Sequence, residues 1–230
     1  LSEQALDETA QITVTDRLTT HALDITDAQA VADLPEQVIA AHGAVDGVVN
    51  VAGIIQRFVP IAELDIGEME KVFAVNFWGT ARMTKAFLPH LLQRPEAAVV
   101  NVGSMGGLVP VPGQSAYGAS KAAVQLFTEG LFAELIDTDV AVTMAYPGAT
   151  NTGIAANSEA AITRDATPSK AAANMTEPAD AAAQILDEGI EKGAFRVLIG
   201  KDTRMLDRLK RLAPKRAVTL VANRMKDLLG

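Results

Sequence analysis

Ser104, Tyr117 and Lys121 are residues whose side chains could act together on one proton. Tyr117 and Lys121 are four positions apart, so on a helix they would share one face. An ordinary tyrosine titrates near ~10, too high for acid–base work at neutral pH, but a neighbouring ammonium favours the phenolate and lowers that pKa. Ser104 ends the apolar run 97–103, and there its hydroxyl could bind a substrate oxygen beside Tyr117. The spacing therefore predicts an acid–base site.

The pair Tyr-x-x-x-Lys is also compatible with an exposed helix lysine that follows a half-buried tyrosine. The residues around the pair decide between this reading and a catalytic one. That context is Tyr117-Gly-Ala-Ser-Lys121, with Ser104 thirteen residues before the tyrosine and Pro147-Gly148 downstream. Together these features resemble the short-chain dehydrogenase/reductase family, and the resemblance extends over nearly the whole chain. It implies an NAD(P)-dependent oxidoreductase on a Rossmann fold that interconverts a secondary alcohol and a ketone or aldehyde.

The resemblance implies catalytic roles for four residues. Tyr117 would be the general acid in reduction and the general base in oxidation. Lys121 would lower the pKa of Tyr117 and bind the nicotinamide ribose, while Ser104 would orient and polarise the substrate oxygen. Asn76 matches a helix asparagine that holds a water in a proton relay to Lys121. An asparagine is unfavourable inside a helix unless its side chain bonds elsewhere; the alternative is a solvent-facing Asn76.

Cofactor contacts follow from three further matches. Asp24-Ile25 resembles the pair that meets the adenine, and Asn50-Val-Ala-Gly53 resembles the Asn-Asn-Ala-Gly motif beside the nucleotide. The second asparagine of that motif, which braces the sheet, is Val51 in this chain. Residues 147–152 fit Pro-Gly-x-x-x-Thr, which meets the nicotinamide carboxamide. The predicted contacts are Asp24, Ile25, Asn50, Ala52, Gly53, Tyr117, Lys121, Pro147, Gly148, Thr150 and Thr152.

The predicted substrate contacts are Met105 and Gln114, because the family lines its pocket at these positions. The loop after Ser104 is mainly apolar, which favours a lipophilic alcohol or ketone as substrate. The alternative for the apolar residues is ordinary loop packing.

The glycine-rich turn Thr-Gly-x-x-x-Gly-x-Gly does not occur in the 230 residues. In the family its amides and the following helix bind the cofactor pyrophosphate. Residues 1–10 resemble the family's second helix, so we expect the first strand, the turn, the first helix and the second strand to precede Leu1. The choice between NAD and NADP stays open, because its determinant belongs to the same region. The alternative is a chain without that segment, a catalytically silent scaffold, against which the intact catalytic set argues.

Apolar strand-like runs alternate with helix-like segments along the chain, which is typical of a doubly wound parallel sheet. We predict a single α/β domain over residues 1–230, Rossmann-type with three α/β/α layers, and a substrate lid loop over 149–175. One predicted strand ends at 21–24, and the four others span 45–52, 97–102, 140–146 and 195–199. The predicted helices span 3–11, 27–42, 66–92, 115–135 and 176–192.

Composition excludes several classes of protein. A net charge of −8 argues against a nucleic-acid binder. The chain has no cysteine and no apolar run of the ~18 residues that a membrane span needs, and no signal peptide is visible, so we expect a cytoplasmic protein. The three histidines show no metal-ligand spacing, so no metal site is predicted.

The C-terminal tail, 203–230, is basic and helical, with leucines between the arginines and lysines. Such a helix can lie on an anionic membrane surface, which predicts peripheral membrane contact. The alternatives are a solvated face or packing on another subunit, and Pro214 should break the helix. Helices 66–92 and 115–135 match the surfaces through which the family forms oligomers, so a homodimer or homotetramer is expected.

Overall fold

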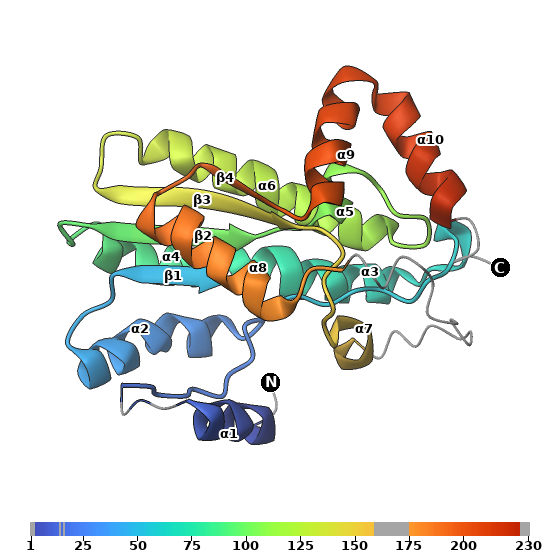
Figure 1. Ribbon diagram of the computed structural model, residues 1–230. Coiled ribbons are helices and arrows are strands. Elements are labelled where there is room, and N and C mark those ends of the chain that lie inside the picture. Colours follow the sequence, from blue (N-terminus) through green and yellow to red (C-terminus); the bar gives the residue numbers. More distant parts are fainter. Residues whose placement is uncertain (1–2, 14, 16, 159–174, 226–230) are drawn as a thin grey trace.

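The computed structural model describes residues 3–13, 15, 17–158 and 175–225. Its described part holds four parallel strands in the order β1-β2-β3-β4 (Figure 1). They are β1 (Gly47–Asn50), β2 (Ala97–Val102), β3 (Val140–Pro147) and β4 (Arg196–Ile199). Helices cover both faces, so the predicted three-layer α/β Rossmann-type fold is confirmed.

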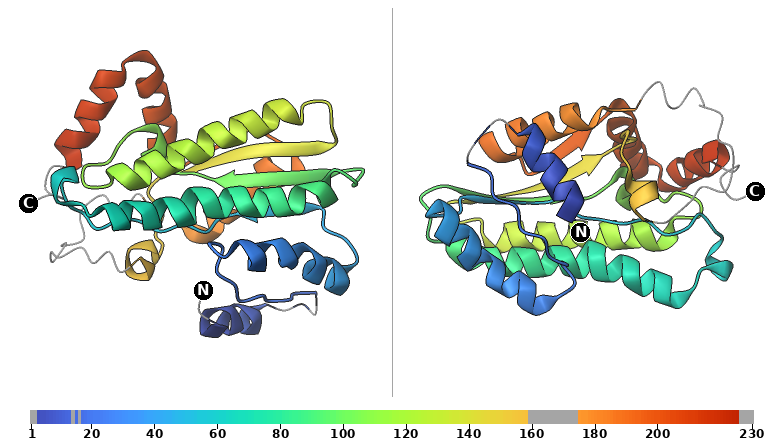
Figure 2. Two further views of the ribbon diagram at one scale, coloured as in Figure 1. Left: turned by 180° about the vertical axis from the view of Figure 1, so that it is seen from behind. Right: turned by 90° about the horizontal axis from the view of Figure 1, so that it is seen from below.

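Three long helices, α2, α4 and α6, cover one face of the sheet (Figure 2). The other face is covered by α8 and the π-helix that continues it. The helices are α1 (Glu3–Ile12), α2 (Ala28–His42), the 3₁₀-helix Ile61–Glu63, α3 (Ile66–Phe73), the π-helix Ala74–Gly79, α4 (Thr80–Leu91), α5 (Met105–Leu108), α6 (Ser115–Glu134), α7 (Ile154–Asn157), α8 (Pro178–Gln184), the π-helix Ile185–Glu191, α9 (Lys201–Leu212) and α10 (Pro214–Met225).

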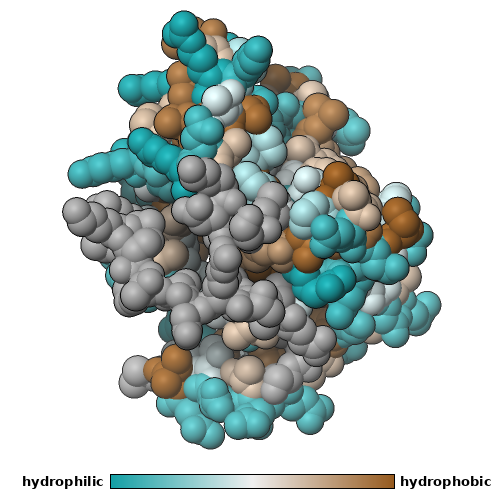
Figure 3. Space-filling view, turned by 90° about the vertical axis from the view of Figure 1, so that its right-hand side faces the viewer, coloured by the Kyte–Doolittle hydropathy of each residue, from teal (hydrophilic) through white to brown (hydrophobic). Residues whose placement is uncertain are grey.

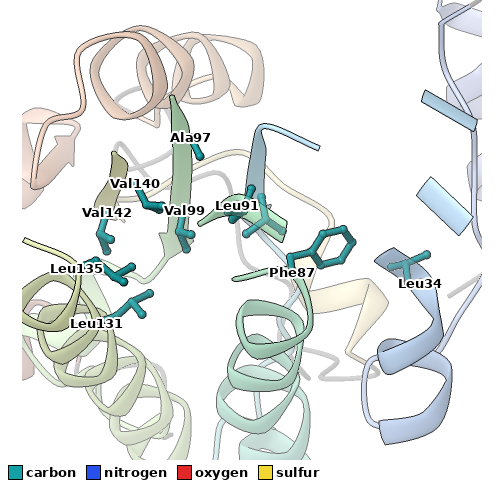
Figure 4. Close-up of a cluster of buried hydrophobic side chains, with 10 residues drawn as sticks. Leu34, Phe87, Leu91, Ala97, Val99, Leu131, Leu135, Val140 and Val142 are labelled. Carbon is teal, nitrogen blue, oxygen red and sulfur yellow. The ribbon is translucent and has the colours of Figure 1, made fainter. Parts of the chain in front are cut away.

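Strand β2 lies at the centre of the core, and all six of its residues are buried. Because side chains alternate along a strand, Val99 joins the cluster under α4 and α6 (Figure 4), whereas Val100 joins the cluster under α8. Phe87 and Leu91 of α4 complete the first cluster. The sheet is thus fixed from both sides, which gives a rigid base to the loops at its carboxyl end.

A buried polar network braces the same sheet. The Asn50 amide nitrogen donates to Asn101 Oδ1 (2.8 Å) and to Thr84 Oγ1 (3.1 Å), and Asn101 donates to Thr128 Oγ1 (2.9 Å). These bonds join β1, β2, α4 and α6. Val51, which replaces the bracing asparagine of the family motif, is 63% exposed, and the network of Asn50 ties the strands together instead.

The structure corrects two sequence predictions. Residues 21–24 form no strand and pair with none of the four described strands. The predicted helix 66–92 contains a π-helical turn at Ala74–Gly79. The tail divides into two helices at Pro214, as its sequence predicts. Most of the predicted lid, residues 159–174, lies outside the described residues, as does the end of the tail, 226–230.

Candidate active site

A cavity of about 470 Å³ opens at the carboxyl ends of β1, β2 and β3. In an open parallel sheet, this is the edge at which ligands bind. Ser104, Tyr117 and Lys121 all line the cavity, so the structure brings together the three residues singled out by their spacing. Apolar side chains of β1, the loop after it, α7 and the π-helix after α8 form further parts of its walls, among them Val49, Val51, Ile154, Ile185 and Leu186.

Ser104 lies two residues after the end of β2 and is the N-cap of the short helix α5. Its Oγ accepts a hydrogen bond from Gly106 N (3.0 Å), so its hydroxyl proton is the donor that can bond to Tyr117 or to a substrate oxygen. A Cβ on Gly106 would lie 3.3 Å from the Tyr117 ring and 3.4 Å from Ser104 Oγ, so the two side chains meet at this glycine. Burial raises the pKa of the Tyr117 phenol above its ordinary value, and its hydrogen bond with Ser104 partly opposes that rise.

Lys121 lies one helical turn after Tyr117 on α6 and is only 4% exposed. Its Nζ donates to Val102 O (2.9 Å), the last carbonyl of β2. Burial lowers the pKa of Lys121 to about 8, because the charged ammonium is withdrawn from water. Among the described residues, Val102 O is the ammonium's one hydrogen-bond acceptor, so two of its three N–H donors remain for a ligand.

Asn76 is completely buried in the π-helical turn, a helix form often found at functional sites. Its Oδ1 accepts from Ile54 N (2.8 Å), and its Nδ2 donates to Ile54 O (2.9 Å) and to Ser120 Oγ (2.9 Å). The amide therefore clamps the loop after β1 against α6. In that loop, a Cβ on Gly53 would lie 3.1 Å from Lys121 Nζ, so the backbone passes closely over the lysine.

The loop after β3 supplies the opposite wall through Pro147, Gly148, Thr150 and Thr152. Ala149 N donates to Asp202 Oδ2 (3.1 Å), so a carboxylate of α9 holds this loop from behind. A Cβ at Gly148 would overlap the Asp202 carboxylate. Sequence reasoning missed Asp202, because no local motif links it to a loop more than fifty residues earlier.

Several predicted site residues lie away from the cavity lining. Asp24 is exposed and accepts from Thr26 N and Thr26 Oγ1 (both 2.8 Å), which lowers the pKa of its carboxyl. Ile25 packs against Gly79, and the Asn50 side chain belongs to the sheet network. Met105 packs in the cluster around Val109 and Leu206, while exposed Ala52 adjoins the lining residues Val51 and Gly53.

Gln114 is also buried, with its Nε2 donating to Gln56 O (2.7 Å). Gln56 was not predicted, yet it is 1% exposed and its Oε1 accepts from the backbone nitrogen of Tyr117 (3.0 Å). It lies in an irregular loop, and its partners are about sixty residues away along the chain. No pattern in the sequence around Gln56 signals this contact.

The cavity residues fit the nicotinamide and ribose of a dinucleotide cofactor. The ammonium of Lys121 has donors to spare for ribose hydroxyls, and the close approach of Gly53 keeps the space beside it free of a side chain. Thr150 and Thr152 offer hydroxyls on the opposite wall. The fit of these residues applies only to the nicotinamide and ribose of the cofactor.

Comparison with known proteins identifies the family. The short chain dehydrogenase family model matches residues 2–163. SadH of Mycobacterium tuberculosis, named as an oxidoreductase, is 34% identical over 208 residues, covering 87% of this chain and 74% of that protein. The chain belongs to the short-chain dehydrogenase/reductase family, and it is an oxidoreductase of that family.

Solved structures agree with this assignment. A short-chain dehydrogenase/reductase of Burkholderia phymatum in complex with NAD has a TM-score of 0.77 at 25% identity, covering 91% of this chain and 80% of that one. A short-chain dehydrogenase of Burkholderia cenocepacia J2315 in complex with NADP has a TM-score of 0.75 at 26% identity, covering 91% and 81%. The predicted family, fold and class of enzyme are therefore confirmed.

Proposed function

We propose that the protein transfers a hydride between NAD or NADP and a small lipophilic molecule, interconverting a secondary alcohol and a ketone or aldehyde. The observation that carries the proposal is the meeting of Ser104, Tyr117 and Lys121 in one cavity at the carboxyl edge of the sheet. The mainly apolar lining favours a lipophilic substrate, because such a cavity offers few polar groups to bind a hydrophilic one.

In the reducing direction, Tyr117 donates its phenolic proton to the carbonyl oxygen as that oxygen gains charge. Ser104 donates a second hydrogen bond to the same oxygen, since its acceptor side is already engaged by Gly106 N. The positive charge of Lys121, one helical turn away, lowers the free-energy cost of converting Tyr117 to its phenolate. Asn76 keeps the loop with Gly53 in place over Lys121. The bound cofactor supplies the hydride.

The first test is a titration of the purified protein with NADH and then NADPH, followed by nicotinamide fluorescence. We expect saturable binding of one of them, after which acetophenone and cyclohexanone serve as ketone probes with that cofactor. Lys121→Ala should weaken cofactor binding as well as turnover, because Lys121 serves both the ribose and Tyr117. If the wild-type protein bound neither cofactor, the proposal would be contradicted. If Lys121→Ala lost turnover but bound cofactor normally, the proposed contact of Lys121 with the ribose would be contradicted.

We also propose that the protein forms a homo-oligomer through the outer faces of α6 and the π-helix Ala74–Gly79. Trp78 is 53% exposed and Leu126 71% exposed, and Phe77 packs edge-on against Trp78 at 5.0 Å between ring centroids. Large apolar groups gathered on a surface mark protein interfaces. Leu126→Arg should shift the sedimentation coefficient towards that of a monomer; a wild-type monomer would contradict this proposal.

A second candidate function is contact with an anionic membrane surface through α9 and α10. No described helix is both long and apolar enough to cross a bilayer. Figure 3 shows hydrophilic side chains with apolar ones among them at the end of the molecule that α9 and α10 form. Arg204, Arg208 and Arg211 lie exposed on α9, together with Leu212, which is 86% exposed.

Vesicle co-sedimentation tests this contact. We expect binding to vesicles of phosphatidylserine and phosphatidylcholine but not to phosphatidylcholine alone, and weaker binding of Arg208→Glu. Lys85→Glu on α4 is a matched charge reversal at an exposed site away from the tail. Equal loss in both variants, or no binding at all, would contradict a specific role for α9.

A further inference from the structure

Helix α6, which carries Tyr117 and Lys121, begins without a capping side chain of its own. Gln114 occupies the N-cap position with φ −126° and ψ 37°, and its side chain makes no capping bond. The first amides of any helix have no partner within the helix, and a serine, threonine or aspartate at the cap usually satisfies them. Gln114 and Ala116 at the start of α6 are buried, so the amides there need an acceptor from elsewhere.

The side chain of Gln56 supplies that acceptor. Its Oε1 accepts from Ala116 N (2.8 Å) and Tyr117 N (3.0 Å), the second and third amides of α6. Its Nε2 donates to Gly113 O (2.9 Å), just before the helix. A single amide group therefore replaces the missing cap and fixes the turn that leads into it.

The contact is reciprocal. The Gln114 side chain donates to Gln56 O (2.7 Å), so the two glutamines clasp the loop after β1 to the start of α6. The same loop is clamped at Ile54 by Asn76, and its Gly53 lies against Lys121 Nζ. One short segment thus touches the backbone of Tyr117 at one end and the ammonium of Lys121 at the other.

We infer that Gln56 is a positioning residue for Tyr117, and that it acts by capping α6 from the loop after β1. The inference rests on the proposed function, in which Tyr117 transfers the proton. Its physical basis is that the phenol can reach the substrate oxygen beside Ser104 only if the first turn of α6 is held in place. A misplacement of about 1 Å at a reacting group can cost on the order of 100-fold in rate.

Gln56→Met tests the inference, because methionine keeps the length and volume but has no amide. We expect the amides of Ala116 and Tyr117 to exchange hydrogen at least about 10-fold faster, since their acceptor is lost. With acetophenone or cyclohexanone as probe, kcat should fall about 10- to 100-fold while the cofactor dissociation constant changes by less than about threefold. Unchanged exchange, or a kcat within about twofold of wild type, would overturn the inference.

Asp27→Ala is the matched control, since Asp27 caps α2 through Gln29 N (2.9 Å) and Ala30 N (3.1 Å). It removes a cap of the same type from a helix that bears no catalytic group. We expect faster exchange at the start of α2 and an unchanged kcat. A similar fall in kcat would show that general destabilisation, and not positioning, explains the effect of Gln56→Met, and would overturn the inference.

Gln56→Glu provides a conservative rescue. A carboxylate still accepts from Ala116 N and Tyr117 N, and negative charge at a helix N-terminus is favourable, but the bond donated to Gly113 O is lost. We expect part of kcat to return and the half-maximal rate of alcohol oxidation to move to higher pH, because an anion near Tyr117 disfavours its phenolate. The substitution leaves Lys121, the other ionisable residue beside Tyr117, in place. A kcat as low as that of Gln56→Met at every pH would overturn the inference.

Tyr117→Phe in the same assay separates this inference from the proposed function. Wild-type turnover by that variant would contradict the proposed function itself. Loss of turnover in Tyr117→Phe together with a normal kcat in Gln56→Met would contradict only the role assigned to Gln56.

Discussion

The buried ammonium of Lys121 should make the stability of the protein depend on pH in a way that one substitution can isolate. Burial lowers its pKa from 10.5 to about 8. Each pKa unit corresponds to about 1.4 kcal/mol, so the charged lysine costs the folded state about 3 kcal/mol near neutral pH. Because the folded pKa lies below the unfolded one, the unfolded chain binds more protons between these values. The contribution of Lys121 to stability therefore rises with pH through this window.

Lys121→Met removes the titrating group while keeping an unbranched, apolar side chain. Its other consequence, an unbonded Val102 O, does not depend on pH. In the absence of cofactor, the unfolding free energy of wild type relative to the variant should rise by about 2 kcal/mol between about pH 7 and pH 10. Urea unfolding at the two pH values measures the difference, and Lys85→Met, at an exposed site, should show none. A flat difference for Lys121→Met would refute the reasoning.

Two further predictions concern the loop over Lys121. Gly53→Ala should lower turnover about 10-fold with little loss of stability, because a Cβ would lie 3.1 Å from Lys121 Nζ and displace the ammonium; steady-state kinetics and urea unfolding check the two parts, and unaltered kinetics would contradict the close approach. Asn76→Ala should destabilise the protein by about 1–3 kcal/mol, because it leaves the part-buried N–H and C=O of Ile54 without their hydrogen bonds to Asn76; urea unfolding measures this, and a loss under about 0.5 kcal/mol would show that the clamp contributes little.

Local signals in the sequence predicted much of the fold. The run 97–102 is apolar except for Asn101, and it forms the central strand with the predicted bounds, because a strand buried on both faces needs no alternation. The start of α6 at Ser115 and the placement of Ser104, Tyr117 and Lys121 also followed from local spacing.

Features that depend on distant contacts could not be predicted in this way. Residues 21–24 look strand-like, but they pair with none of the described strands, and a local pattern carries no information on such pairing. The π-helical turn at Asn76 interrupts an otherwise regular helical pattern, because the asparagine bonds to a loop twenty-two residues earlier. Gln56 acts across about sixty residues, so its role emerges only when the loop and α6 are seen together.

The account depends most on Tyr117 as the group that transfers the proton. The chain has two tyrosines, and the other, Tyr146, is buried in β3 and is not among the residues that line the cavity, which makes Tyr146→Phe a matched control. The measurement is single-turnover hydride transfer with saturating cofactor. Tyr117→Phe should be slower by about 100- to 10,000-fold with cofactor binding largely intact, whereas Tyr146→Phe should stay within about twofold of wild type. Wild-type rates in Tyr117→Phe would contradict the account.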